Sequence, residues 1–446
     1  MKDLSVGSPA KQILTFTVPM LIGHGFQQMY NIVDTIILGK FIGTDAVAAA
    51  GASFPVIFVL VSLVIGITTG ITVVISQYFG AKDYKKVKQA IDTATIFLFF
   101  GSLLLTGLGL LFIEPVWALL NLPENLIEGA TIYFNVIAIG LVFMFGYNGI
   151  GAVLRGLGDS KTPLYFLIIA TILNIVLDLV FVLVFNWGIA GVAIATVVSQ
   201  AVAFGLCVIY LNRYHKLIRV SYRGLVFDKG IFWKSVKIGL PSGVQHTAVA
   251  LGMMAILKIV NNFGTITIAG YSIAGRIDSF AALPAMSFSA ALSIFVGQNI
   301  GANKPERIKQ GLRSTLIMTS AYSIFISLVA WFFGMHLMGL FTNDPQVIEA
   351  GYEYLVIVSS FYVFFSAMFA NHGLLRGAGD TLIPMFITIL ALWLLRIPVS
   401  HFLSQKMGTA GIWWGIPIAW VFSWFITHLY YLSGKWKGKA VMNHQG

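Results

Sequence analysis

The stretch LRGLGD at residues 154–159 recurs 221 residues later as LRGAGD at residues 375–380. The same spacing relates further pairs: Gln77 and Gln298, Gly80 and Gly301, Ile127 and Ile348, and Tyr133 and Tyr354. Because every pair keeps this spacing, the two copies align with almost no gaps. The chain therefore contains two copies of one structural unit.

The composition places both copies in a membrane. Of the 446 residues, 58% are hydrophobic and only 10% are charged, whereas a soluble domain carries about 25% charged residues. Twelve apolar runs reach the roughly 20 residues that cross a bilayer as a helix. They lie at 12–38, 46–77, 90–112, 126–154, 163–186, 189–212, 234–262, 267–298, 312–335, 346–375, 382–405 and 409–433. We expect an all-α integral membrane protein with twelve transmembrane helices.

The repeat also predicts the domain organisation. Six spans in each copy mean that both copies enter the membrane from the same side, so the two six-helix lobes are parallel. We predict an N-lobe at residues 1–212, a basic linker at 213–233 and a C-lobe at 234–446. Duplicated bundles of this kind are typical of transporters, with a cavity between their halves.

The net charge of +11 is a topology signal. Most of the Lys and Arg residues fall in alternate connections, such as residues 82–88, 213–237 and 304–313. Cationic loops remain in the cytoplasm, which predicts a multi-pass protein of the plasma (inner) membrane with both termini inside. The basic residues then contact anionic lipid headgroups, and we expect no nucleic-acid partner. Cys207 is the single cysteine, so an internal disulfide is excluded.

Two acids in the first copy are the strongest candidates for function. Asp34 and Asp178 fall inside apolar spans, where a charge costs several kcal/mol unless it is paired or hydrated. Asn174 lies on the same helical face as Asp178. With Asn174 and Thr196 as neutral ligands, the two acids would bind H⁺ or Na⁺. The alternative is a pair of buried, hydrogen-bonded structural aspartates.

The second copy carries cations instead. Lys258, Arg276 and Arg396 fall in its spans, with Asp278 two residues from Arg276. These groups could receive an anionic group of a substrate. Alternatively, Lys258 extends to the membrane surface and Arg276 pairs with Asp278 for structural reasons.

Aromatic and methionine side chains in the spans suit a binding cavity for varied amphipathic molecules. With neighbouring polar groups, the predicted cavity residues are Tyr30, Asn31, Met29, Phe54, Phe58, Met144, Phe145, Met253, Phe280, Met286, Arg276, Asp278 and Lys258. Any one of the apolar residues could instead serve packing or face lipid. Pro19 interrupts the first span and offers a hinge.

The chain resembles the MATE family of multidrug and toxin extrusion transporters. The resemblance rests on the twelve spans, on YNIVDT at 30–35, on SQYFGA at 76–81 and on LRGLGD at 154–159. Asp34, Asn174, Asp178 and Thr196 are similar to the coupling site of the DinF-like branch. The NorM-like branch also uses acids of the second lobe, and Lys258 in the seventh span departs from that pattern.

The resemblance implies export of amphipathic, often cationic, compounds by antiport with H⁺ or Na⁺. It implies a monomer without cofactors or a resident metal beyond the coupling ion. A flippase for lipid-linked precursors, built on the same superfold, remains an alternative. An enzyme is disfavoured because no nucleotide-binding loop, metal-ligand cluster or nucleophile motif is present in the sequence.

Overall fold

The computed structural model describes residues 2–214 and 224–442, which form α-helices joined by short turns. The first-copy helices are α1 (Pro9–Ile37), α2 (Thr44–Gly80), α3 (Tyr84–Leu119), α4 (Glu124–Gly156), α5 (Lys161–Leu179) and α6 (Gly188–Tyr214). The second-copy helices are α7 (Lys229–Asn261), α8 (Thr265–Gly301), α9 (Pro305–Gly339), α10 (Pro345–Ser359), α11 (Tyr362–Gly377), α12 (Leu382–Ile389), α13 (Ile397–Met407) and α14 (Thr409–Leu432). Three π-helical segments, η1 (Leu38–Ile42), η2 (Val180–Val184) and η3 (Leu390–Arg396), extend α1, extend α5 and join α12 to α13. A short 3₁₀ helix, η4 (Lys435–Lys439), follows α14.

The predicted membrane architecture is confirmed. Within the described residues, 10 helical spans are long and apolar enough to cross a bilayer. One of them is the continuous run through α12, η3 and α13. An eleventh span is the pair α10 and α11, which is bent by 52°. The helix α1, with 29 residues, is long enough to cross a bilayer but is not among these spans.

The chain forms two compact units, and two helices, α1 and α7, are each divided between them. Unit 1 contains Lys2 and Pro19–Leu240, and unit 2 contains Asp3–Val18 and the described residues from Pro241 onward. The chain therefore passes from one unit to the other at a proline inside α1 and at a proline inside α7. The units depart from the predicted lobes at residues 3–18 and 234–240. Residues 215–223 of the predicted linker lie outside the described residues.

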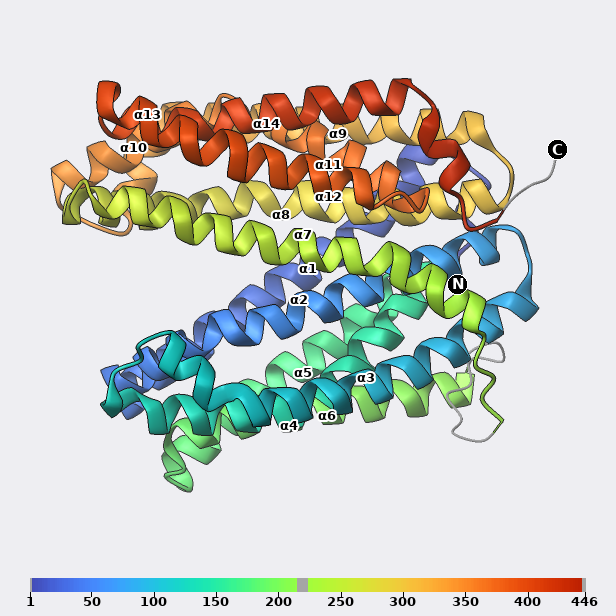
Figure 1. The fold of residues 1–446 in the computed structure, drawn as a ribbon, viewed down its shortest axis with the longest axis horizontal. Helices are drawn as coiled ribbons and strands as arrows, with labels where there is room; N and C mark the ends of the chain where they lie inside the picture. The colour runs from blue at the N-terminus through green and yellow to red at the C-terminus, as the bar shows by residue number, and fades with distance from the viewer. Residues whose placement is uncertain (1, 215–223, 443–446) are drawn as a thin grey trace. The chain divides into compact units, whose positions relative to one another are not determined.

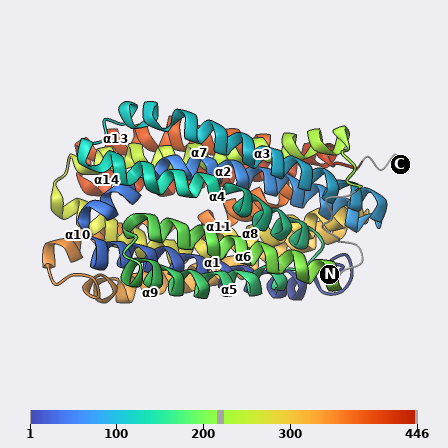
Figure 2. The ribbon, with the colours of Figure 1, turned by 90° about the horizontal axis from the view of Figure 1, so that it is seen from below.

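Packing inside each unit repeats along with the sequence. In unit 1, α4 packs most extensively against α2, and α3 and α6 also run beside α4 (Figures 1 and 2). In unit 2, the bent pair α10 and α11 takes the place of α4 and packs against α8. A Cβ added to Gly156 would lie 3.0 Å from the Thr72 carbonyl oxygen, and one added to Gly377 would lie 2.2 Å from that of Ser293. The repeated turn therefore needs glycine because two helix backbones touch there.

The rest of the repeated turn follows helix-end chemistry. Gly158 and Gly379 adopt positive φ angles of 82° and 92°, which glycine tolerates without strain. Asp159 accepts hydrogen bonds from the backbone N–H groups of Lys161 and Thr162, both at 3.0 Å. Its carboxylate therefore satisfies two backbone N–H groups at the start of α5, which have no partner within the helix.

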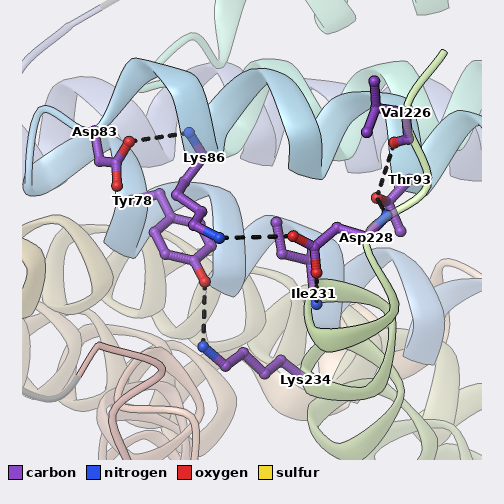
Figure 3. Close-up of polar contacts among 8 residues, drawn as sticks. All are labelled: Tyr78, Asp83, Lys86, Thr93, Val226, Asp228, Ile231 and Lys234. Carbon is purple, nitrogen blue, oxygen red and sulfur yellow. Dashed lines mark hydrogen bonds and ion pairs between the residues drawn. The ribbon is translucent and has the colours of Figure 1, made fainter.

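A clasp of polar contacts in unit 1 holds the segment before α7 (Figure 3). Thr93 on α3 accepts from the backbone N–H of Asp228 at 3.0 Å. Lys86 lies 3.6 Å from the Asp228 carboxylate, and Lys234 on α7 donates to the Tyr78 hydroxyl at 3.2 Å. The backbone N–H of Ile231 donates to Asp228 and, with a smaller contribution from Lys86, holds the pKa of that carboxyl below its usual range.

A second clasp in unit 2 holds the segment before α1. The backbone N–H of Leu4 donates to Gln298 at 2.8 Å, and the Leu4 carbonyl accepts from Asn299 and Arg307, both at 3.2 Å. Arg307 also donates to the Asn299 side chain at 2.9 Å. Unit 1 therefore binds the segment before α7, whose second half belongs to unit 2. Unit 2 binds the segment before α1, whose second half belongs to unit 1.

Candidate functional site

Asp34 and Asp178 lie together in unit 1. Asp34 is 8% exposed on α1, and Asp178 is fully buried on α5. The two carboxyl groups lie within hydrogen-bond range of each other. Their contact is a hydrogen bond only when one of them carries a proton, because two carboxylates have no donor. The structure thus brings together the two acids that the sequence singles out.

The buried oxygens of this pair lack donors. In the described part of the chain, Oδ1 of Asp34 and both oxygens of Asp178 receive no hydrogen bond from another side chain or the backbone. Both amide atoms of Asn174, which is also fully buried, have no partner either. Buried polar atoms are rarely left unsatisfied, and such groups often mark a site for an ion, a water or a proton. This constellation favours an ion-binding role over two structurally satisfied aspartates.

Thr196 has a supporting place beside the acids. Its hydroxyl donates to the Val192 carbonyl at 3.1 Å and accepts from the Tyr30 hydroxyl at 2.9 Å. Tyr30 lies within electrostatic range of both Asp34 and Asp178. Thr196 thereby fixes the Tyr30 ring at the edge of the acid pair, and its oxygen keeps one lone pair.

Tyr133 on α4 was not predicted as a site residue. It lies within electrostatic range of both Asp34 and Asp178. The signal that could have identified it is its recurrence as Tyr354, since a tyrosine repeated at span depth is unusual among otherwise apolar pairs.

Backbone irregularities accompany the acids. Asp34 lies one helical turn before η1, and Asp178 lies two residues before η2. π-Helical turns are uncommon and occur often at functional sites, because the wider turn redirects side chains and loosens the backbone ladder. These π-helical segments were not predicted from the sequence.

The remaining predicted cavity residues are mostly accessible. The exposed members are Met29, Asn31, Phe54, Met253, Lys258, Arg276, Phe280 and Met286, and the half-buried members are Tyr30, Phe58, Met144 and Asp278. Phe145 departs from the expectation. It is 1% exposed and packs near Gly101 of α3, so its ring belongs to the core of unit 1 in this conformation. Exposure alone does not show that these residues line a cavity, so their assignment to one stays a prediction.

Asp278 of unit 2 has different partners from those the sequence suggests. Tyr362 donates to its Oδ1 at 2.6 Å and Tyr354 to its Oδ2 at 3.3 Å. Among the residues that the structure describes, no ion pair joins it to Arg276. The proposed structural pair of Arg276 and Asp278 is therefore wrong. Residues two apart on a helix point in directions about 200° apart, so this pair was geometrically unfavourable.

The bend between α10 and α11 makes the tyrosine contacts possible. Tyr354 and Tyr362 are eight residues apart, which is about 12 Å along a straight helix. The 52° break between Ser359 and Tyr362 lets both hydroxyls reach one carboxylate. Stacking of Tyr271 on Trp413 at 5.4 Å, with Tyr354 edge-on to both rings, fixes the first of these hydroxyls.

Comparisons with known proteins identify the family of the repeated unit. The MatE family profile matches residues 19–180 and again residues 241–402, so the family unit is the sequence repeat. Probable multidrug resistance protein YpnP of Bacillus subtilis is 33% identical over 99% of each chain. Probable multidrug resistance protein YoeA of the same organism is 32% identical over 96% of this chain and 94% of its own.

A solved structure has the same fold. It is described as the outward-facing conformation of a multidrug resistance MATE family transporter of the MOP superfamily. Its TM-score is 0.91 at 21% identity, and the match covers 97% of this chain and 98% of that one.

Proposed function

The chain belongs to the MatE family, and we propose that it exports amphipathic compounds, often cationic, in exchange for H⁺ or Na⁺ bound in unit 1. The adjacent carboxyl groups of Asp34 and Asp178, with three buried oxygens that lack donors, are the observation that supports this proposal. The names of its relatives attach multidrug resistance to proteins that align over nearly the whole chain.

Electrostatics explains why this pair needs an ion. Two adjacent carboxylates in a low-dielectric interior repel each other and lose most of their hydration. A proton shared between them, or a Na⁺ ion held between them, removes this cost. For Na⁺, the Asn174 carbonyl and the Thr196 hydroxyl would supply further oxygen ligands, which hard cations prefer.

The proposed coupling step uses α1. Ion binding neutralises the acid pair, and α1 then bends near Pro19, where the helix lacks one backbone hydrogen bond. The bend reduces the space beside Tyr30 and Asp34, so substrate leaves to the outside. The ion drives this change only if it binds one conformation more tightly than the other. Return to the inward-facing conformation releases the ion into the cell.

The topology is part of the proposal. The basic connections place both termini in the cytoplasm of a plasma-membrane protein. Each unit binds its own ligands, and a monomer is sufficient for the cycle. Small amphipathic molecules and the lipid bilayer are the only partners that it requires.

Efflux from proteoliposomes tests the proposal directly. We expect an imposed pH gradient or an imposed Na⁺ gradient to drive uptake of a fluorescent cationic dye into inside-out vesicles, and the effective gradient identifies the ion. Asp34→Asn should abolish the gradient dependence because it removes the charge that the ion neutralises. Asp45→Asn, at an exposed acid that begins α2, is the matched control and should leave transport unchanged. Gradient-driven transport by Asp34→Asn at the wild-type rate would contradict the proposal.

A further inference from the structure

Arg396 of unit 2 is a buried cation without a direct counter-ion. It is 9% exposed and ends the π-helical segment η3, in the middle of the span formed by α12, η3 and α13. Within residues 2–214 and 224–442, no acid lies within 4.0 Å of its guanidinium, and its Nε has no hydrogen-bond acceptor. A buried guanidinium costs several kcal/mol unless something compensates its charge. Among the described residues, nothing supplies that compensation by direct contact.

Asp278 is the acid whose charge reaches Arg396. It lies beyond ion-pair distance, and two tyrosine hydroxyls hold its carboxylate in place. Asp278 and Arg396 therefore interact through their charges and without direct contact. Asp278 can thus stabilise the cation electrostatically without occupying its donors.

The donors of Arg396 suit a planar anion. A guanidinium presents N–H groups in a rigid fork that matches the two oxygens of a carboxylate. Glu353 of α10 accepts from Thr409 and Trp413 at 2.8 and 3.1 Å, and among the described residues it forms no ion pair with Arg396. The missing acceptor is therefore expected from outside the chain.

The neighbourhood of Asp278 on α8 is not fully closed, because Asp278 is half-buried. An amphipathic molecule that reaches this side of α8 could place its acid group against the guanidinium of Arg396. Two backbone irregularities, the α10–α11 bend and η3, lie at this site, as irregular helices often do at ligand sites inside membranes.

We propose that Arg396 is a specificity-determining residue that receives the carboxylate of an amphipathic substrate in unit 2. This inference rests on the proposed transport function and adds a substrate class to it: amphiphiles that carry a carboxylate, including zwitterions. Asp278 keeps the cation stabilised when the site is empty, and it limits how tightly an anion binds.

A matched pair of dyes tests the assignment. Rhodamine B carries a free carboxylate, and its ethyl ester has the same ring system with that group blocked. Equilibrium binding of both dyes to the purified full-length protein, measured by fluorescence anisotropy without any ion gradient, gives the ratio of the two dissociation constants. We expect Arg396→Gln to weaken binding of the acid about tenfold, the usual effect of losing a charged hydrogen-bond pair, and to leave the ester within about twofold.

Further variants separate recognition from folding. Arg396→Lys keeps the charge but loses the fork, so it should weaken acid binding less than Arg396→Gln does. Asp278→Asn should tighten binding of the acid, because it removes a negative charge near the bound carboxylate. Lys406→Gln, at an exposed cation near the end of the same span, should leave both dyes unaffected.

The outcomes are distinct. Equal weakening of the acid and the ester by Arg396→Gln would assign the residue a structural role and overturn the inference, as would no change for either dye. Because binding is measured without a gradient, the acid-to-ester ratio does not depend on coupling. If Asp34→Asn transports normally while Arg396→Gln weakens binding of the acid and not of the ester, the coupling proposal fails and this inference stands.

Discussion

Two tyrosines at repeat-equivalent positions face different chemistry in the two units. Tyr133 lies near Asp34 and Asp178, which come from α1 and α5. Tyr354 donates to Asp278, which comes from α8, and that acid lies within electrostatic range of Arg396. The duplication therefore preserved the frame around the tyrosine, whereas the charged residues arose on different helices in each copy.

The difference in charge suggests a division of labour. The acid pair of unit 1 has no nearby cation of its own in the described residues to neutralise it, so it depends on an external ion. At the unit 2 site, Asp278 and Arg396 carry opposite charges that compensate each other at a distance. By the 221-residue spacing, Arg396 corresponds to Ile175, the neighbour of Asn174. The charge of Arg396 therefore has no counterpart at the equivalent position of the first copy.

The largest effect is expected from a substitution that disrupts the acid pair of unit 1. Asp178→Asn should lower gradient-driven dye transport by at least about tenfold, and the double variant with Asp34→Asn should be no slower, because groups that act as a unit give non-additive losses. Transport rates in proteoliposomes measure this, with Asp45→Asn as the control. Independent losses that multiply in the double variant would show that the two acids do not form one site.

Substitutions of the repeated glycines compare how closely the helices pack in the two units. Gly377→Ala places a Cβ 2.2 Å from a carbonyl oxygen, whereas Gly156→Ala places one at 2.9 Å or more from its nearest neighbours. We expect Gly377→Ala to destabilise its unit by about 3 kcal/mol and Gly156→Ala by about 1 kcal/mol, as overpacking does. Thermal unfolding in detergent measures both. Gly275→Ala has no atom within 4 Å of its Cβ and should be neutral. An equal loss of stability from the two substitutions would contradict the closer helix packing at Gly377.

The tyrosines of unit 2 should contribute unequally. Tyr362 bonds Asp278 at 2.6 Å and Tyr354 at 3.3 Å. We expect Tyr362→Phe to cost about 2 kcal/mol and Tyr354→Phe about 1 kcal/mol, because short hydrogen bonds to a charged acceptor are the stronger ones. The midpoint of thermal unfolding gives the order, and Tyr322→Phe, which loses a 3.3 Å bond to a backbone carbonyl, is a matched control. A larger loss from Tyr354→Phe would mean that its ring contacts outweigh the hydroxyl.

The smallest effect concerns the clasps. Lys86→Ala removes a partly exposed ion pair and should cost at most about 0.5 kcal/mol. Arg307→Ala should cost more, because its guanidinium donates to both Leu4 and Asn299. Hydrogen exchange of residues 2–8 and 224–232 measures the local loosening. Equal protection in both variants would show that the contacts of Arg307 are replaced by water.

The clasp of unit 1 should also respond to acid. The folded-state pKa of Asp228 lies below its usual value of about 3.9, so its contribution is fully present above that pH and is lost as pH falls through the lower folded-state value. Hydrogen exchange of residues 224–232 should therefore be unchanged between pH 5 and 8. Loosening at pH 5 would contradict the assignment.

Local patterns in the sequence determined the repeat, the twelve spans, the caps of the repeated turn and the two acids of unit 1. These features depend on residues close together in the chain or on the cost of a charge in an apolar span. The tertiary structure alone decided that Asp278 bonds two tyrosines and not Arg276. It also decided that Arg396 lacks a direct partner, and that each unit begins the helix which the other completes at Pro19 and Pro241. These outcomes depend on which helices pack together and where their backbones bend, and helical periodicity carries no information about either.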